Sequence, residues 1–413
     1  MDTQSGRQST TIRTLSRREL MLGTGSALLA SAFSSGCSFP WSGSKSRTLT
    51  SGYIPILDSV PLIVAFERNI FEELGVKAEK PTLIRAWPAL MEAFTSRQIL
   101  LTHILLPQVI FLKYAQDVAV RSVAFNHTNV VAMMLSKSVR SFQDLGGKTV
   151  GCPTWWAPHT GIFQDVLRKA GLTPVVGKSE GDLRANEVAF RVVPPPDMTE
   201  GLKSGSLAGC TVSEPFGAAA EVLADATLAK MSGDVWPNHP CCQSVMLQDT
   251  IDEDPAWAQA VTIALYRAAL WAKNNREALA EMLGKEGGGY FPMPIKVVKR
   301  ALLKQDLDTY GPDGTGAIMH PDWNVTRVDF NPYPFASAFD TTIDMMKRMV
   351  VDESAALPSQ LKRLSGKEIA DTIVDYDLAQ AGIEDVGGMK AFTGEDGTSY
   401  SRDELYEVAL KNL

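Results

Sequence analysis

The chain has 413 residues, of which 45% are hydrophobic and 21% charged, so it is long enough for two to three domains with a sizeable core, and disorder, collagen and coiled coil are excluded. Its formal charge is -7, and the part after residue 36 carries -9, because residues 1–36 hold four Arg, one Asp and one Glu. Such an acidic body argues against binding to nucleic acid or to an anionic lipid surface.

Residues 1–36 have the pattern of an export signal. Arg17 and Arg18 precede a short apolar stretch that is diluted with Gly and Ala and followed by small residues. This order is typical of cleaved bacterial signal peptides. The paired arginines resemble the twin-arginine type, which exports folded proteins. We therefore expect the protein in the periplasm or on the outer face of the cytoplasmic membrane.

Gly36-Cys37 resembles the cleavage site of bacterial lipoproteins, in which the cysteine becomes the acylated first residue. Cys37 is the expected lipidation site, and ordinary cleavage with an unmodified cysteine is the alternative. Residues 37–47 are rich in serine and suit a flexible tether. No apolar run reaches about 18 residues, so the lipid is the only expected contact with the membrane.

After the tether, short apolar runs alternate with helical patterns, which indicates β-α-β units around a mainly parallel sheet. In the first cycle, strands are predicted at residues 48–54, 80–84, 99–105, 118–125 and 130–135, and helices at 60–74 and from 87. In the second cycle, which begins near residue 141, residues 142–151 lead into a predicted strand, and further strands are predicted at 188–193 and 207–212. Helices are predicted at 157–170, after 196 and after 215. From Pro255 onward the pattern is mostly helical.

Two such cycles predict two lobes with a cleft between them. We expect lobe 1 over residues 48–140, lobe 2 over 141–245, and a return to lobe 1 with a helical C-terminal extension over 246–413. Each lobe is predicted to be a mainly parallel sheet flanked by helices. The role of the stretch from Ala356 onward is left open.

Polar and aromatic residues stand at several predicted strand-to-helix turns, where ligands bind in open α/β sheets. Asp58 with Ser59 is expected to cap one helix, Asp197 with Glu200 to form a capping box, and Glu214 to cap a third. Trp87 and residues 154–159 mark two further turns. Free amides at helix N-termini suit an anion, so this pattern predicts a binding cleft.

Enzyme motifs are missing from the sequence. Gly147-Lys148-Thr149 resembles the end of a phosphate loop, but a strand follows it where a helix is required. No G-x-S-x-G, H-E-x-x-H or C-x-x-C occurs. We therefore predict that the protein is not an enzyme and holds no cofactor.

Four cysteines remain after Cys37. Cys152 and Cys210 end two apolar runs predicted to be neighbouring strands, so a disulfide and two buried thiols are both open. Cys241 and Cys242 follow His239 closely enough to be considered a metal cluster. Adjacent side chains point to opposite sides of an extended chain, so packing or pocket lining is expected there and no metal site.

Several motifs, in order, resemble those of one family. They are GYIPILDSVPLIVA at 52–65, HILLP at 103–107, VPPPDM at 193–198, LKSGSLAG at 202–209, VSEPF at 212–216 and DVWPNHP at 234–240. Over residues 50–345 the chain resembles the nitrate- and bicarbonate-binding proteins of bacterial ABC importers, within the wider nitrate, sulfonate and taurine group. This resemblance implies a two-lobed periplasmic-binding-protein fold of type II, which closes on its solute by hinge motion.

The resemblance also implies a set of site residues. In those proteins a Trp, a His, a Gln and a Lys contact the anion; Trp87 and His159 fall at the first two positions, Val130 at the Gln position and Cys242 at the Lys position. Without that lysine the pocket is less basic. Trp155 and Trp156 either stack on a planar ligand or belong to the core. A small anion and a larger, planar or weakly charged solute both remain open.

The function implied by the resemblance is a monomeric solute-binding receptor that delivers its ligand to an ABC permease. The alternatives are a ligand sensor for a membrane regulator and an enzyme similar to the thiamine-pyrimidine synthases, which share the fold. The expected ligand-binding residues are Asp58, Trp87, Asn126, Asn129, Thr154, Trp155, Trp156, His159, Glu214, His239 and Cys242.

Overall fold

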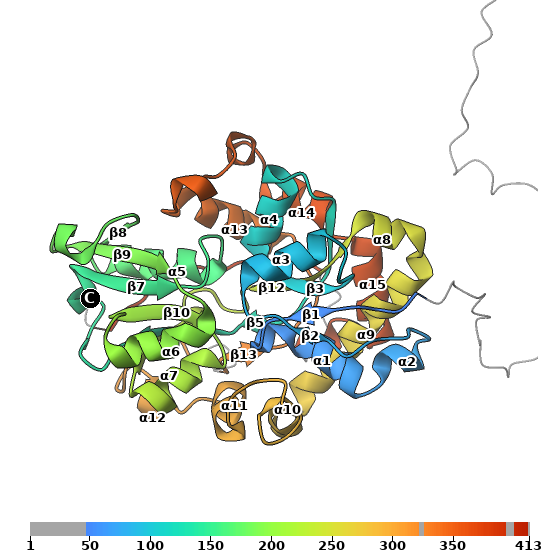
Figure 1. Ribbon diagram of the computed structural model, residues 1–413, viewed down its shortest axis with the longest axis horizontal. Coiled ribbons are helices and arrows are strands. Elements are labelled where there is room, and N and C mark those ends of the chain that lie inside the picture. The colour runs from blue at the N-terminus through green and yellow to red at the C-terminus, as the bar shows by residue number, and fades with distance from the viewer. Residues whose placement is uncertain (1–46, 322–325, 394–399, 412–413) are drawn as a thin grey trace, which may run out of the picture. The chain divides into compact units, whose positions relative to one another are not determined.

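Residues 47–321, 326–393 and 400–411 are described by the structure, a computed structural model (Figure 1). The predicted twin-arginine signal, Cys37 and all of the tether except Arg47 lie outside the described residues. The chain from Gly43 to Leu413 forms one compact unit.

One sheet is built around a strand that returns late in the chain. Strand β12 (Cys242–Leu247) is antiparallel to both of its neighbours, β3 (Thr102–Leu105) and β4 (Val120–Phe125). Strand β1 (Gly52–Tyr53) pairs in parallel with β2 (Thr82–Leu83), and Ser51 bridges to Leu101 just before β3. The early helices are α1 (Val60–Glu67), α2 (Ile70–Glu73), α3 (Trp87–Thr95) and α4 (Leu106–Ala115).

The second sheet has six strands in the order β11-β6-β10-β7-β9-β8. Its strands are β6 (Val131–Leu135), β7 (Lys148–Cys152), β8 (Thr173–Val175), β9 (Glu187–Val192), β10 (Gly209–Ser213) and β11 (Thr227–Met231). Strands β7 to β10 pair in parallel, whereas β6 is antiparallel to β10 and β11. Figure 1 shows α5 (Pro158–Lys169) on one side of this sheet, and α6 (Pro195–Ser204) and α7 (Phe216–Ala224) on the other.

The chain crosses between the two sheets after β4 and again after β11. The first crossover contains β5 (Thr128–Asn129), which pairs with β13 (Val328–Asp329). The short 3-10 helices are η1 (Leu57–Ser59), η2 (Gln143–Leu145), η3 (Glu180–Asp182), η4 (Ser232–Asp234), η5 (Glu353–Ala355) and η6 (Ser359–Lys362). The crossovers therefore bring η4, β5 and the start of β12 to the junction of the sheets.

The later part of the described chain is mostly helical, as predicted. Its helices are α8 (Gln248–Glu253), α9 (Pro255–Asn274), α10 (Arg276–Leu283), α11 (Ile295–Leu302), α12 (Leu307–Tyr310), α13 (Ser337–Arg348), α14 (Gly366–Ile373), α15 (Tyr376–Asp385) and α16 (Lys390–Thr393). Helix α9 packs on α1 and α15, and α13 packs on α4, α5 and α14. Within the described residues, every helix is too short or too polar to span a membrane.

The segment at residues 400–411 contacts elements of both sheets. Tyr406 donates a hydrogen bond of 2.6 Å to Asp165 of α5. The Glu404 carboxylate accepts one of 2.6 Å from the indole of Trp236, in the crossover after β11, and one of 2.8 Å from Ser337 of α13. This C-terminal segment therefore ties together three elements that are distant in the sequence.

Three local predictions about helices are wrong. The helix predicted at 60–74 is divided into α1 and α2, because Asn69 takes a left-handed conformation with φ of 59°. The hydroxyl of Ser59 donates to the Ile56 carbonyl and does not cap α1. The box of Asp197 and Glu200 is absent, because the prolines at 194–196 start α6 at Pro195.

Cys152 and Cys210 lie on the neighbouring strands β7 and β10 as free, buried thiols. Cys210 is opposite Gly151, one residue from Cys152, so the two cysteines are offset along the ladder. Of the two open alternatives, the structure contains the pair of buried thiols.

Candidate functional site

A buried ion pair joins η1 to the first crossover. The Nε2 atom of His127 lies 2.9 Å from Oδ1 of Asp58, and the exposed fraction of both side chains is 0%. Burial opposes ionisation, but each partner favours the charged form of the other, so the pKa of His127 is raised to about 10 and that of Asp58 is held well below its usual range. At neutral pH the pair is a carboxylate with an imidazolium.

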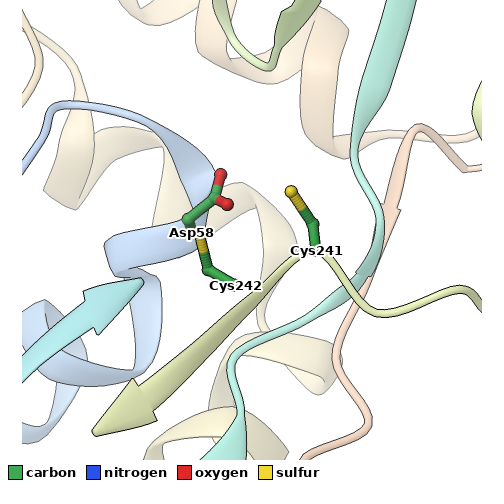
Figure 2. Close-up of side chains that lie close together, drawn as sticks. All are labelled: Asp58, Cys241 and Cys242. Atoms are coloured by element: carbon green, nitrogen blue, oxygen red, sulfur yellow. The ribbon is translucent and has the colours of Figure 1, made fainter. Parts of the chain in front are cut away.

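Two thiols lie beside this pair. Cys241 and Cys242 stand at the start of β12, where their carbonyls accept hydrogen bonds from the amides of Leu106 at 2.8 Å and Asn126 at 3.0 Å. Both sulfur atoms and a carboxylate oxygen of Asp58 lie within 4.8 Å of one another (Figure 2). The expectation that adjacent cysteines diverge is wrong here, because Cys241 precedes the regular strand and does not follow its alternation.

The two thiols differ in acidity. Burial raises the pKa of Cys241, but hydrogen bonds from Cys242, His127 and His159 outweigh burial and lower it to about 6. The Nδ1 atom of His159 lies 3.9 Å from the Cys241 sulfur. Burial and the neighbouring Cys241 raise the pKa of Cys242 well above its usual value.

His103 of β3 and Trp87 of α3 form an aromatic edge of the site. Their rings are 5.9 Å apart in an edge-on arrangement. The Nε2 atom of His103 accepts a hydrogen bond of 3.1 Å from the Ile54 amide, and burial lowers its pKa to about 4, so the ring is neutral. Trp87 is buried, and its indole N–H has no hydrogen-bond partner among the described residues.

The crossover polar residues hold the local backbone. Asn126 donates to the Asp58 carbonyl at 2.6 Å and accepts from Ser244 at 2.8 Å. Asn129, with φ of 66°, accepts from the Asn238 amide at 2.9 Å. His239 is placed by contacts of 2.7 Å to the Ser232 hydroxyl and 3.0 Å to the Pro240 carbonyl. These three candidates fix the loops that carry Asp58 and Cys241.

The turn before α5 supplies the candidates from the six-stranded sheet. The Thr154 carbonyl accepts a hydrogen bond of 2.9 Å from Thr160. Trp155 is half-buried, whereas Trp156 is buried and stacks on Phe111 of α4 at 6.1 Å. His159 is buried, and in the part of the chain that the structure describes its Nε2 atom has no hydrogen-bond partner. His159 therefore lies nearest to the thiols, while Trp156 packs against α4.

Glu214 has a bracing role, with both carboxylate oxygens engaged. Oε1 accepts a hydrogen bond of 2.7 Å from Arg327, and Oε2 accepts one of 2.8 Å from the Ala218 amide, so Glu214 caps α7 as predicted. Its carbonyl accepts from the Leu57 amide at 2.8 Å. Glu214 thus holds η1, and with it Asp58, against β10 and α7.

Buried polar atoms without a hydrogen-bond partner recur among these residues. Leaving such a group unpaired costs about 1–3 kcal/mol, so it marks a place where a bound solute can supply the partner. Apart from the atoms of the Asp58–His127 ion pair, the unpartnered atoms include Trp87 Nε1, His103 Nδ1, Asn129 Nδ2, Trp156 Nε1 and His159 Nε2.

His127 and His103 were not among the site residues expected from the sequence, and only packing or pocket lining was expected of Cys241. The sequence carries no local signal for these residues, because Asp58, His127 and Cys241 meet only through the long connections between sheets. Two histidines and two adjacent cysteines in apolar segments were the only available hint.

Residues 42–284 match the NMT1-like family. The chain belongs to this family. It is 25% identical over 306 residues to the nitrate/nitrite binding protein NrtA of Nostoc sp.. This alignment covers 64% of this chain and 68% of that protein. The NMT1-like chain spans 63% of a second such protein, from Synechococcus elongatus, at 22% identity.

Solved structures identify the fold of this NMT1-like chain. The periplasmic nitrate-binding protein NrtA of Synechocystis superposes with a TM-score of 0.68 at 19% identity, over 87% of this chain and 93% of that one. The alkanesulfonate-binding protein SsuA of Xanthomonas axonopodis superposes with a TM-score of 0.54 at 15% identity, over 73% of this chain and 91% of that one. The predicted family and the periplasmic-binding-protein fold are confirmed.

Proposed function

We propose that this chain is the extracytoplasmic solute-binding receptor of an ABC importer and that its solute binds at the buried cluster of Asp58, His127, Cys241 and His159. The observation that carries the proposal is the set of charged and unpartnered polar atoms gathered where the chain crosses between the two sheets. The relatives named above are binding proteins, which supports a receptor and not an enzyme.

Binding requires the molecule to open. His127 and Asp58 have no exposed side-chain surface, and His159 is 1% exposed, so a solute reaches them only when the two sheets move apart. We assign residues 48–140 with 246–413 to one lobe and 141–245 to the other. The crossovers after β4 and β11 are then the hinges, and closure removes water from the bound solute.

The charges of the cluster bear on what it binds. Cys242 occupies the position at which the resembling anion binders have a lysine, and Asp58 adds a carboxylate that is balanced by His127 alone among the described residues. A small oxyanion at this point would lie beside the Asp58 carboxylate and would have no lysine to pair with. The cluster therefore favours a neutral or positively charged solute over nitrate or bicarbonate.

The cellular setting follows from the export signal. We propose that the mature protein is held at the outer face of the cytoplasmic membrane through acylated Cys37, acts as a monomer, and passes its solute to a permease. Replacing Cys37 with Ala should release the protein into the soluble periplasmic fraction. Finding the unchanged protein already soluble and free of lipid would contradict the anchor.

Thermal unfolding of the purified exported protein tests the receptor function. The panel contains nitrate, nitrite, bicarbonate, sulfonates, planar heterocycles and divalent metal cations. A solute at 100 times its Kd adds about 2.7 kcal/mol to the free energy of unfolding. Asp58→Asn and His159→Gln should abolish the shift, whereas Arg140→Ala, which alters an exposed ion pair, should keep it. An equal shift in all variants would place the solute elsewhere.

A further inference from the structure

We propose that Asp58, Cys241 and Cys242 form a binding site for a thiophilic divalent cation, of the chemical type of Zn²⁺ or Cd²⁺. The inference rests on the proposed receptor function and names the class of its solute. It also assigns a use to the two thiols, which a pocket for nitrate or bicarbonate would leave without one.

The distances suit coordination. One carboxylate oxygen of Asp58 and the sulfurs of Cys241 and Cys242 lie within 4.8 Å of one another, and Figure 2 shows them gathered from η1 and the start of β12. With zinc–sulfur bonds of about 2.3 Å, two sulfurs of a tetrahedral site lie about 3.8 Å apart. The two sulfurs, at most 4.8 Å apart, therefore exceed this separation by no more than about 1 Å.

Burial makes a cation favourable at this point. The carboxylate and both sulfurs are fully buried, and among the described residues the one ion pair of Asp58 is with His127. Buried thiols become thiolates only when a bound cation takes the place of their protons, because buried ionised groups are costly without a countercharge. A divalent cation supplies that charge and bonds directly to all three atoms.

Two imidazoles border the proposed ligands. His127 Nε2 lies 2.9 Å from Asp58 Oδ1, and His159 Nδ1 lies 3.9 Å from the Cys241 sulfur. The imidazole of His159, with two thiolates and a carboxylate, gives the four-coordinate N, O and S set that zinc adopts, while His127 remains paired with Asp58. Sulfur ligands select such soft cations over Mg²⁺ and Ca²⁺, which prefer oxygen.

The placement of the ligands couples the cation to closure. Asp58, Cys241 and Cys242 belong to η1 and β12, beside the three-stranded sheet, whereas His159 begins α5 on the six-stranded sheet. A cation held by the first three residues in the open molecule gains His159 only on closing. Metal binding thus favours the closed form, as a receptor requires.

Cadmium titration of the reduced, purified exported protein tests the site. We expect one Cd²⁺ per chain, with the ultraviolet thiolate-to-cadmium absorption of two sulfurs, and no response to Mg²⁺. Cys241→Ser and Cys242→Ser should each weaken binding about tenfold or more. Cys152→Ser is the matched control, since it removes another buried free thiol, on β7, and should leave binding unchanged.

A second measurement uses the wild-type protein alone, so it does not depend on whether any variant folds. In the wild-type protein, bound Cd²⁺ should slow alkylation of Cys241 and Cys242, read by mass spectrometry, and should leave the rate at Cys152 and Cys210 unchanged. Absence of both the absorption and the protection would overturn the site. So would a disulfide between Cys241 and Cys242 in the protein as isolated.

The outcomes separate the two proposals. If Cd²⁺ and Zn²⁺ fail to bind but another solute stabilises the protein and loses its effect in His159→Gln, the metal site is wrong and the receptor function stands. If Cd²⁺ binds to the thiols without making the molecule more compact in solution scattering, and nothing else in the panel does so, the metal site stands and the receptor function fails.

Discussion

Oδ1 of Asp58 and Nε2 of His127 lie 2.9 Å apart in an ion pair that no solvent reaches. Removing one member leaves the other charge buried alone, which typically costs about 3–5 kcal/mol. We expect Asp58→Asn and His127→Gln each to lose about that amount in urea unfolding with a chelator present. The double variant should lose less than the sum of the two. Additive losses would show that the two side chains do not stabilise one another.

Arg327 is the second buried charge on which the junction depends. It donates to Glu214 at 2.7 Å and also contacts Glu221 of α7, so its guanidinium joins two carboxylates. Arg327→Met should lower the free energy of unfolding by about 3 kcal/mol, and Arg327→Lys should not restore it, because an ammonium lacks the planar fork. Arg140→Met, at an exposed pair, should change it by less than about 1 kcal/mol.

His103 should make the free energy of unfolding depend on pH. Burial lowers its pKa in the folded chain to about 4, below the ordinary value of 6.5, so the unfolded chain takes up the proton first. This group therefore costs stability as the pH falls from 6.5 to about 4, by at most about 3 kcal/mol. His103→Gln keeps an acceptor for the Ile54 amide and should remove that slope in urea unfolding. Parallel pH profiles would show that His103 is not responsible.

Cys152 and Cys210 should be inert in the folded protein. Burial raises the pKa of Cys152 to about 12 and raises that of Cys210 further, and thiolates are the reactive form. Iodoacetamide at pH 8 should label neither residue until the protein is unfolded in urea. Mass spectrometry of tryptic peptides gives the readout. Rapid labelling under native conditions, or a disulfide joining the two, would contradict the buried free thiols.

Hydrophobic patterning predicted much of the fold because burial decides which runs become strands. The runs at residues 102–105, 120–125 and 131–135 are strands within the predicted bounds. Patterning did not predict where α1 ends. The left-handed conformation of Asn69 interrupts the helix, but the apolar residues keep their helical spacing across it. It also misplaced the start of α6: the prolines start this helix at Pro195, so Asp197 lies inside its first turn and does not cap it.

Part of the candidate site was also predictable. Asp58, Trp87 and His159 were expected from their places at strand-to-helix turns, and the structure buries all three. The juxtaposition of Asp58 with Cys241 depends on where β12 re-enters the first sheet, which is a tertiary property. Rules for extended chains do not cover Cys241, since it lies one residue before the strand.

The C-terminal segment at residues 400–411 has a kinetic consequence. Through Tyr406 and Glu404 it bonds to α5, to α13 and to the crossover that carries Trp236. Helix α13 already packs on α5, and Arg348 pairs with Asp165, so the segment adds to contacts that have to yield before this junction opens. In the proposed receptor, we therefore expect opening to be a slow step shared by entry and exit, and the segment to lengthen the residence time of a solute while leaving its equilibrium affinity largely unchanged.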